Sequence, residues 1–529
     1  MFAKFKLLFP KLLILILFGN FLLNVYGIWW GLPSWRGWAP DELIPAAVLD
    51  GIKQAFSHGW YEKYPPFHYY ILTLAYLPVF VLHWLHLIDM QSFTTYNVLF
   101  YIGRFISVLM GTGAVFMVYL CGRELYDKSA SLLAAFITAL IAPFIYYAKI
   151  TNLDAPYIFW FVCSLYFYIR ILKSHRLADY LFFATMAVLS VCTKDQVYGL
   201  YLLTPIPIIV SAYLNQKEAN PFARIIGAMV NRKTCLALVS AIALFFAIHN
   251  ILFNLDGFRR HLKLIIGPAS EGYKIYAPTI EGHVQMFWQS LKHLRFSFGW
   301  PLFLTGLIGV AVELLRKPKN YLLLGLLIPA LSYYLFFISV ILYNYDRFFI
   351  PICIILAFFG GKCLSDLLQA LRRFSIGKIV LVSGIFLYTL LYSVSIDILM
   401  DQDSRYYAES WLEQHVDQNA LLGFVGLVEY LPRAQKFTRK EYLLNPSVEA
   451  LKQIKPDYLI VNADVRWGNK NFYTLLNEGK LGYTIFFQYR TDLKWLLLNR
   501  DDMVQNDRKV IFTNLDKINP EIKVFKKTF

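Results

Sequence analysis

Long apolar stretches separated by short polar segments make up most of the chain before about residue 400. Each stretch approaches the ~20 residues that a helix needs to cross the hydrocarbon core of a bilayer. The first stretch is longer than the apolar core of a signal peptide and has no small-residue cleavage site, so we expect a retained helix. The pattern predicts eleven spans, near residues 7–30, 101–122, 129–148, 155–173, 179–194, 197–213, 234–253, 299–316, 320–342, 346–365 and 376–397.

A twelfth apolar segment, 67–88, is interrupted by Pro78 and contains three histidines. Lys and Arg are concentrated in short loops between the other stretches, as expected for loops retained in the cytoplasm. All these basic loops lie on one side of the membrane only if 67–88 does not cross. We therefore predict that 67–88 is a re-entrant or interfacial helix on the outer side. The outer segments would then be 31–100, 149–154, 194–196, 254–298, 343–346 and everything after about 398.

After residue 398 the chain mixes charges of both signs with short apolar stretches. Helical spacing of Ala408, Trp411 and Leu412 predicts a helix over Ser404–His415, and Asn445–Lys455 predicts a second one. The short apolar stretches predict strands at Leu421–Val425, Tyr458–Val461, Tyr483–Phe487 and Trp495–Leu498. The predicted fold is thus a mostly α polytopic membrane module, 1–398, with a large first outer loop, 31–100, and a soluble extracytoplasmic α/β domain, 399–529.

The composition agrees with a membrane protein, because 57% of residues are hydrophobic and 16% are charged. The net charge of +16 is concentrated in the loops, where positive-inside sorting explains it, so we do not expect a nucleic-acid partner. The six cysteines lie in or beside apolar stretches and include no CxxC pair. A disulfide framework or a thiolate metal site is therefore not expected.

Three carboxylates at predicted membrane boundaries are candidates for catalysis. Asp41 and Glu42 follow the first span among several tryptophans, and Asp154 lies between two spans. A carboxylate at such a place can accept a proton from an incoming hydroxyl or amine. Each also has a structural alternative, since Pro40-Asp41-Glu42 is a common helix start and Asp154 would suit a helix N-cap.

Cations on the same predicted side are candidates for binding a phosphate or diphosphate leaving group. They are Lys63, Lys194, Arg259 and Arg347. The alternatives are snorkelling side chains and, for Lys194, an ion pair with the adjacent Asp195. Glu62 and His68 are weak candidates for a shared divalent metal, and no other cofactor is expected.

Taken in order, these residues resemble the GT-C glycosyltransferases of the protein O-mannosyltransferase and lipid A aminoarabinose transferase type. The resemblance rests on Asp41-Glu42, Pro65-Pro66-Phe67, Asn152–Pro156, Thr193-Lys194 and Arg347 with Pro351, and on Asp403–Tyr406 and Lys455–Tyr458 in the C-terminal part. It implies an inverting transferase in which Asp41 is the base with Glu42 beside it, and Asp154 is a second acid that orients the acceptor or the base. Lys63, Lys194 and Arg347 would bind the carrier phosphate. Relatives often have Lys directly before the Pro-Pro pair, whereas Tyr64 intervenes here.

The expected function is transfer of a sugar from a polyprenyl-phosphate donor, of undecaprenyl or dolichyl type, to a hydroxyl or amine of a lipid, glycan or protein. A nucleotide sugar is not available outside the cytoplasm, so the donor has to be bound to the membrane. The expected location is the bacterial inner membrane, with the site on its outer side. A lipid or sugar transporter is the main alternative, but transporters tend to place ionisable residues near the bilayer midplane in inverted repeats, and no repeat is evident. A scaffold protein is a third reading.

Overall fold

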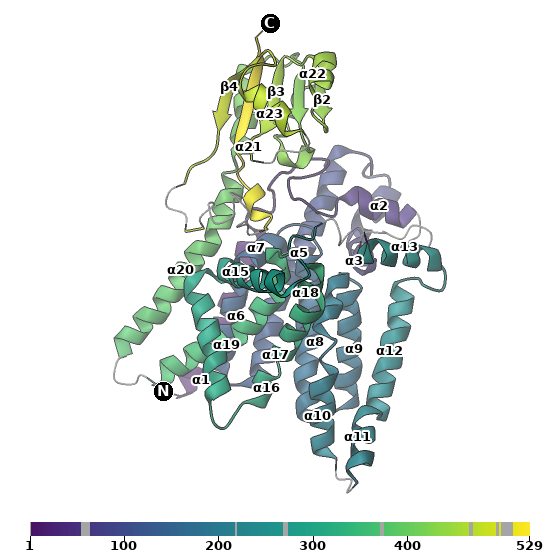
Figure 1. The fold of residues 1–529 in the computed structure, drawn as a ribbon, viewed down its shortest axis with the longest axis vertical. Helices are drawn as coiled ribbons and strands as arrows, with labels where there is room; N and C mark the ends of the chain where they lie inside the picture. Colours follow the sequence, from purple (N-terminus) through teal and green to yellow (C-terminus); the bar gives the residue numbers. More distant parts are fainter. Residues whose placement is uncertain are drawn as a thin grey trace.

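A membrane-type bundle of helices carries a small sheet domain at one end (Figure 1). The computed structural model describes residues 2–53, 64–216, 220–267, 273–370, 375–464, 469–493, 497–498 and 512–528, and side chains are described from residue 10 onward except that of residue 375. The predicted class, a mostly α polytopic membrane protein with a small C-terminal α/β domain, is confirmed.

The helical part runs from residue 2 to residue 401 within these ranges. Its first elements are α1 (Phe2–Val25), α2 (Pro45–Lys53), α3 (Phe67–Ala75), α4 (Leu77–Trp84), α5 (Phe93–Leu125), α6 (Lys128–Ala139), α7 (Ala142–Ala148), α8 (Asp154–Ser174), α9 (Leu177–Val191), η1 (Asp195–Leu200), α10 (Pro205–Asn215), α11 (Pro221–Met229), α12 (Arg232–Ile248) and α13 (Leu255–Ile266). They are followed by α15 (Ile280–Leu315), α16 (Tyr321–Leu324), α17 (Leu327–Tyr333), η2 (Tyr334–Ile338), α18 (Ser339–Ile341), η3 (Asp346–Phe349), α19 (Ile350–Ala370) and α20 (Ser375–Asp401).

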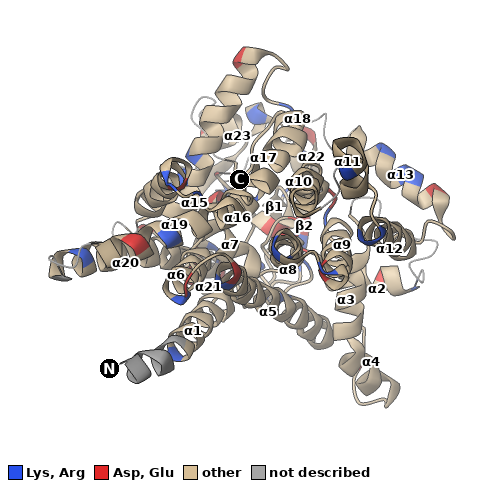
Figure 2. Cartoon of the chain, turned by 90° about the horizontal axis from the view of Figure 1, so that it is seen from below, with Lys and Arg blue, Asp and Glu red and all other residues tan. Residues whose placement is uncertain are grey.

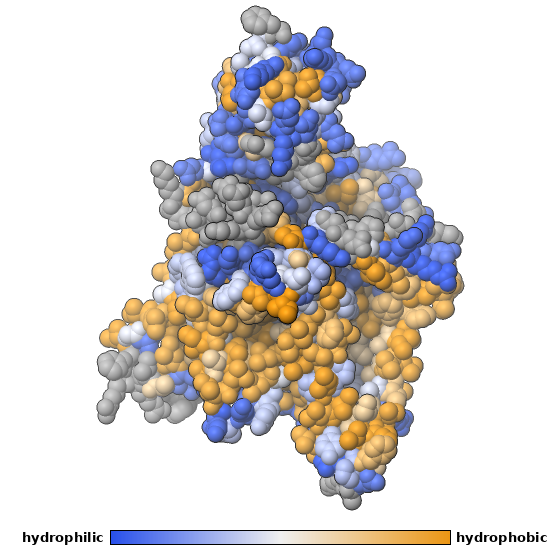
Figure 3. Space-filling view, viewed as in Figure 1, coloured by the Kyte–Doolittle hydropathy of each residue, from blue (hydrophilic) through white to orange (hydrophobic). Residues whose placement is uncertain are grey.

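By length and apolarity, eight helical segments of the described chain can cross a membrane, or ten if each of two bent pairs is one span. The predicted number of eleven is therefore approximate. Two of the predicted spans correspond to shorter apolar helices, Pro10–Val25 and Leu177–Val191. On the face seen in Figure 3, a broad hydrophobic band covers the helices and gives way to mostly hydrophilic residues on the sheet domain. Lys and Arg are sparse along the helices seen from below (Figure 2).

Two of the predicted segments each form a pair of helices with a bend at a short break. The stretch 129–148, predicted as one span, is divided into α6 and α7 with an angle of 67° between them. Pro143 in the first turn of α7 suits a helix start and cannot continue α6. The segment 67–88 forms α3 and α4, bent by 47°, a geometry of either a broken span or a re-entrant loop. The prediction that it does not cross thus stays a prediction.

Small residues allow the central helices to approach each other closely, as is common in membrane bundles. A Cβ atom added to Gly361 of α19 would lie 2.6 Å from the backbone nitrogen of Ala134 in α6. One added to Gly309 of α15 would lie 2.4 Å from the carbonyl oxygen of Phe359 in α19. These contacts fix α6, α15 and α19 side by side beneath the sheet domain.

The C-terminal domain is a five-stranded sheet between helices. The strand order is β2-β1-β3-β5-β4, with β1 parallel to β2 and β3, and β5 antiparallel to β3 and β4. Alternate strand residues face opposite sides, so one core forms against α21 and the other against α22 and α23. The elements are α21 (Ser404–His415), β1 (Leu422–Val425), η4 (Val428–Tyr430), β2 (Lys440–Leu443), α22 (Val448–Ile454), β3 (Tyr458–Asn462), α23 (Lys470–Asn477), β4 (Tyr483–Tyr489), η6 (Leu515–Lys517) and β5 (Ile522–Lys527).

Most predicted elements of this domain are present. Helix α21 has the predicted bounds, α22 is shorter than Asn445–Lys455, and three predicted strands correspond to β1, β3 and β4. Of the predicted strand Trp495–Leu498, only 497 and 498 are described, and they form a bend. Strands β2 and β5 and helix α23 were not predicted. The predicted boundary after residue 398 falls in the last turn of α20.

Candidate active site

The loop after α1 brings Asp41 to the junction of the bundle and the C-terminal domain. Gly31 in this loop has φ +71°, and a Cβ there would lie 2.7 Å from the backbone nitrogen of Trp38, so only glycine fits. Asp41 itself has φ 61°, a left-handed conformation that aspartate tolerates better than most residues. No helix starts at Pro40, because α2 begins at Pro45. The helix-start alternative for Asp41-Glu42 is therefore wrong.

Glu42 is adjacent to Asp41 but faces another partner. Its two carboxylate oxygens accept hydrogen bonds from Nε and Nη2 of Arg104 in α5, both at 2.7 Å. The two side chains are 1% and 0% exposed, so this is a fully buried bidentate ion pair. The backbone N–H of Thr151 donates a further bond of 2.9 Å to the Glu42 carboxylate. Glu42 thus joins the first loop to α5 and to the segment before α8.

Four charged side chains from distant parts of the sequence meet beside this loop. Asp41 Oδ2 accepts a hydrogen bond of 3.3 Å from Nη1 of Arg347, and the same Nη1 lies 3.9 Å from Oδ2 of Asp154. Asp154 Oδ1 accepts a 2.6 Å bond from Nζ of Lys194. The result is a row of alternating charges, Asp41, Arg347, Asp154 and Lys194, which we call the charge row. All four were predicted from the sequence to be site residues.

Asp41 is the most exposed member of the charge row. The Asp41 side chain is 31% exposed and Arg347 15%, whereas Asp154 is fully buried. Asp154 is the first residue of α8, and its N–H donates to Asn152 Oδ1. Its carboxylate is engaged with Lys194, so it is not the side-chain cap of that helix.

Lys194 lies in the turn between α9 and η1, next to the ring of Tyr157. Burial is the main cause that lowers the pKa of its ammonium to about 8, against the opposing effect of Asp154. The ordinary lysine pKa is about 10.4, so Lys194 titrates much closer to neutrality. The alternative pairing of Lys194 with Asp195 is not observed, since Asp195 Oδ1 pairs with His261 Nε2 at 3.0 Å.

Arg347 lies in η3, directly before α19, and the residue before it contacts the C-terminal domain. Its guanidinium lies 4.6 Å from the centre of the Tyr345 ring, and its backbone N–H donates to Asp346 Oδ1 at 2.6 Å. The other oxygen of Asp346 accepts a 2.6 Å bond from Thr513 Oγ1. The C-terminal domain therefore contacts the residue directly before Arg347.

The remaining predicted candidates are placed apart from the charge row or outside the description. Arg259 lies on α13 with 69% of its side chain exposed and pairs with Asp256 of the same helix. Lys63 and Glu62 lie outside the described residues. His68 is buried, with no hydrogen-bond partner for either ring nitrogen in the described chain. Within the same residues, no group of three or more His, Cys, Asp and Glu side chains could hold a metal ion.

Several buried charges that organise this region were not predicted. Arg104 and Lys149 are fully buried, the latter paired with Asp397 of α20. Arg104 sits inside an apolar stretch, and an ionisable residue there is a signal that could have been used. Asp397 likewise closes an apolar stretch, but nothing local in the sequence indicates its partner.

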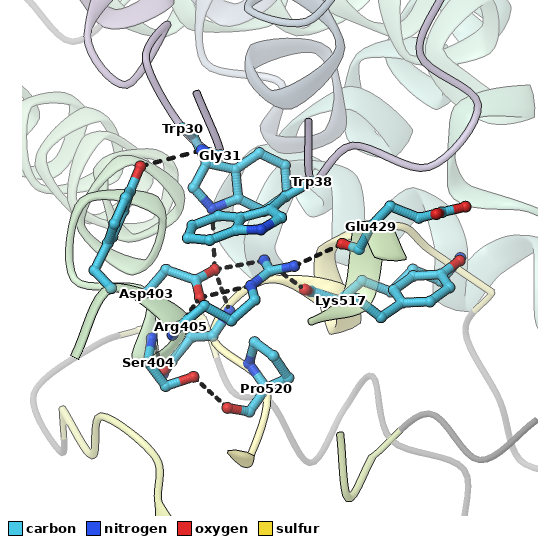
Figure 4. Close-up of polar contacts among 12 residues, drawn as sticks. Trp30, Gly31, Trp38, Asp403, Ser404, Arg405, Glu429, Lys517 and Pro520 are labelled. Carbon is cyan, nitrogen blue, oxygen red and sulfur yellow. Dashed lines mark hydrogen bonds and ion pairs between the residues drawn. The ribbon is translucent and has the colours of Figure 1, made fainter. Parts of the chain in front are cut away.

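The contact between the C-terminal domain and the first loop is centred on Arg405 (Figure 4). Its guanidinium binds both oxygens of Asp403, at 2.9 and 2.7 Å, and lies 4.2 Å from the centre of the Trp38 ring. Trp30 Nε1 donates a 2.9 Å bond to Asp403. Arg405 also donates to the carbonyl oxygens of Glu429 and Lys517, at 2.9 and 3.2 Å. Because Arg405, Asp403 and Trp30 are fully buried or nearly so, this contact is part of a packed interface between the domain and the loop that carries Asp41.

Part of the helical bundle is similar to a known family of glycosyltransferases. Residues 99–253 match the family described as Dolichyl-phosphate-mannose-protein mannosyltransferase. This match agrees with the predicted resemblance to the GT-C glycosyltransferases over these residues of the bundle.

One sequence relative is YkcB of Bacillus subtilis (strain 168), which is named as a mannosyltransferase. The two are 24% identical over 240 residues, which span 43% of this chain and 29% of that protein. Among solved structures, the oligosaccharyltransferase AglB of Archaeoglobus fulgidus, in complex with an inhibitory peptide and a dolichol-phosphate, matches with a TM-score of 0.47 at 13% identity, covering 99% of this chain and 88% of that one. ArnT of Cupriavidus metallidurans, bound to undecaprenyl phosphate, matches with a TM-score of 0.45 at 11% identity, covering 99% and 98%.

Proposed function

We propose that the protein is a GT-C-type glycosyltransferase that uses a polyprenyl-phosphate-linked sugar as its donor and transfers the sugar, with inversion, to a hydroxyl or amine group. The observation that carries the proposal is the charge row itself. It places a partly exposed carboxylate, Asp41, next to the cation of Arg347, and Asp154 links Arg347 to a second cation, the buried Lys194. A reaction that removes a proton from one reactant and releases a phosphate from the other needs these two kinds of group close together.

Each member of the charge row has a role in this chemistry. Asp41 accepts the proton of the acceptor as its oxygen or nitrogen attacks the anomeric carbon of the sugar. The bond between that carbon and the phosphate oxygen breaks on the opposite face, and the carrier leaves as a phosphate anion. Arg347 and Lys194 bind this anion, and their fixed positions lower the cost of its developing charge. Asp154 holds both cations in place and orients the base.

In this proposal Glu42 does not transfer a proton but positions the turn that carries Asp41. Its carboxylate is occupied by Arg104 and by the Thr151 N–H, so it fixes the turn that carries Asp41 against the start of α8. This assigns two different roles to the adjacent acidic residues.

The position of the charge row supports a donor that is linked to a membrane lipid. It is at the junction of the apolar bundle and the polar C-terminal domain, where a lipid-linked phosphate at the membrane surface can reach it. We place this surface on the outer side of a bacterial inner membrane, in accord with the basic loops of the sequence. The acceptor would be a glycolipid, a glycan or a protein at that surface.

The base role of Asp41 is tested by a substitution with a matched control. Asp41→Asn removes the proton acceptor and keeps the shape, whereas Asp50→Asn changes an aspartate of α2 that is 57% exposed. Purified variants in lipid vesicles would receive a radiolabelled polyprenyl-phosphate sugar and an acceptor lipid extract. We expect Asp41→Asn to slow transfer by roughly 100- to 10,000-fold, the usual contribution of a general base, and Asp50→Asn to leave it unchanged. Equal rates for the two variants would contradict the proposed role.

A further inference from the structure

A short segment of the C-terminal domain, residues 512–518, lies against the residues around Arg347. The backbone N–H of Asp346 donates a 2.9 Å bond to the carbonyl oxygen of Phe512. Thr513 Oγ1 donates to Asp346 Oδ2, and the hydroxyl of Tyr345 donates to Asn514 Oδ1. Three consecutive residues of the segment thus bind two consecutive residues before Arg347.

Both the side-chain ammonium and the backbone carbonyl oxygen of Lys517 have partners within the C-terminal domain. Its ammonium donates a 2.9 Å hydrogen bond to Asn514 Oδ1 and lies 5.8 Å from the centre of the Tyr430 ring. Its carbonyl oxygen accepts the bond from Arg405 seen in Figure 4. The position of the lysine is therefore set by the same contact that joins the C-terminal domain to the first loop.

The charge of Lys517 acts on the charge row. Burial lowers the pKa of its ammonium, Asp516 and Asp41 raise it, and Arg347 lowers it further. Asp41 also raises the pKa of Tyr430, although burial is the larger cause there. In the described part of the chain, no carboxylate lies within 4 Å of the Lys517 ammonium.

Two further N–H groups in this place are buried without an acceptor among the described residues, Nε of Arg347 and Nδ2 of Asn514. The Asn514 amide is oriented by its oxygen, which accepts from both Tyr345 and Lys517. Buried donors without acceptors cost free energy in the empty protein. A ligand with several negatively charged oxygens would satisfy them and the ammonium together.

We propose that the C-terminal domain forms part of the substrate-binding site and that Lys517, with Asn514 and Arg347, binds an anionic oxygen group, the phosphate of the polyprenyl carrier. This inference rests on the proposed function and extends it. The domain then supplies a phosphate-binding residue from a position 170 residues after Arg347 in the sequence (517 − 347).

The test measures equilibrium binding of radiolabelled undecaprenyl phosphate to the full-length protein in lipid nanodiscs. Lys517→Gln keeps a donor for Asn514 but removes the charge, and Lys517→Arg keeps the charge. Lys480→Gln changes a lysine of the same domain that is 65% exposed and pairs with Glu478. We expect Lys517→Gln to weaken binding about tenfold, and Lys517→Arg and Lys480→Gln to bind like the wild type.

Equal binding by Lys517→Gln and Lys480→Gln, with wild-type binding intact, would overturn this inference alone. Absence of undecaprenyl phosphate binding to the wild type would instead overturn the proposed function with it. The variants are compared at equal thermal stability, and Lys517→Arg tests the role of charge if Lys517→Gln unfolds. Loss of binding by Lys517→Arg to the same degree as Lys517→Gln would also contradict a charge-based role.

Discussion

At the scale of single residues, the ion-pair partner and the exposure of each charged side chain determine whether it can exchange a proton with a substrate. Asp41 and Glu42 are neighbours in the sequence, yet one is partly exposed beside Arg347 and the other is enclosed by Arg104. Consecutive residues in a turn point in different directions, so adjacency in the sequence could not separate the two roles. The four members of the charge row could be predicted because each follows or precedes a long apolar stretch on one predicted side.

The lowered pKa of the buried Lys194 predicts that the proposed activity depends on pH in the alkaline range. The pKa of about 8 means that Lys194 carries a charge below this pH and becomes neutral as the pH rises through it. A polyprenyl phosphodiester keeps its charge in this range, so only the protein side of the contact titrates. We expect kcat/KM for the donor, which reports the pKa of the free enzyme, to fall above about pH 8. In Lys194→Arg the fall would be absent, because arginine stays protonated. The same fall in both proteins would contradict the assignment.

The Glu42–Arg104 pair is expected to contribute to stability more than to the chemical step. Glu42→Gln leaves the Arg104 guanidinium buried without a countercharge, which typically costs about 3–5 kcal/mol. Thermal unfolding of the purified protein should therefore show a clearly lower Tm. Asp50→Asn, at an exposed position, serves as the control and should change stability by less than about 1 kcal/mol. A Tm of Glu42→Gln equal to that of the control would be inconsistent with the structural role.

At the scale of helices and strands, the apolar pattern predicted which segments are helical better than it predicted their breaks. The stretch 129–148 reads as one apolar span, but α6 ends at Ala139 and α7 turns away by 67°. The pattern could not show this because both halves are buried and apolar. Strand β5 was missed since its neighbours β3 and β4 lie at least 33 residues before it in the sequence (522 − 489).

Close packing between α6 and α19 depends on a glycine. A Cβ at Gly361 would lie 2.6 and 2.8 Å from backbone atoms of α6, whereas one at Gly384 of α20 would meet nothing within 4 Å. We expect Gly361→Ala to destabilise the protein by about 1–3 kcal/mol, the usual cost of overpacking. Gly384→Ala should be neutral or slightly stabilising. Comparison of the two Tm values in detergent checks this, and equal values would argue against a close helix contact at Gly361.

At the scale of the whole molecule, the proposed catalytic region belongs to both parts of the chain. The bundle supplies the charge row, and the C-terminal domain contacts the residue before Arg347 through Thr513 and the first loop through Asp403. The sequence predicted both parts and their order. It could not predict that residues 512–518 lie against Asp346, because nothing local in either segment indicates the other. Arg259 was predicted to lie on the same side of the membrane as the charge row, but its side chain is exposed on α13.

The central claim is covalent transfer of a sugar away from a polyprenyl-phosphate carrier. Its most direct test uses wild-type protein in vesicles, with a donor labelled in the sugar and, differently, in the polyprenyl chain. We predict that each sugar transferred to the acceptor is matched by one released polyprenyl monophosphate, and that Asp41→Asn slows the formation of both products to the same degree. Movement of the intact donor across the bilayer, with both labels still joined, would contradict the account and identify a transporter instead.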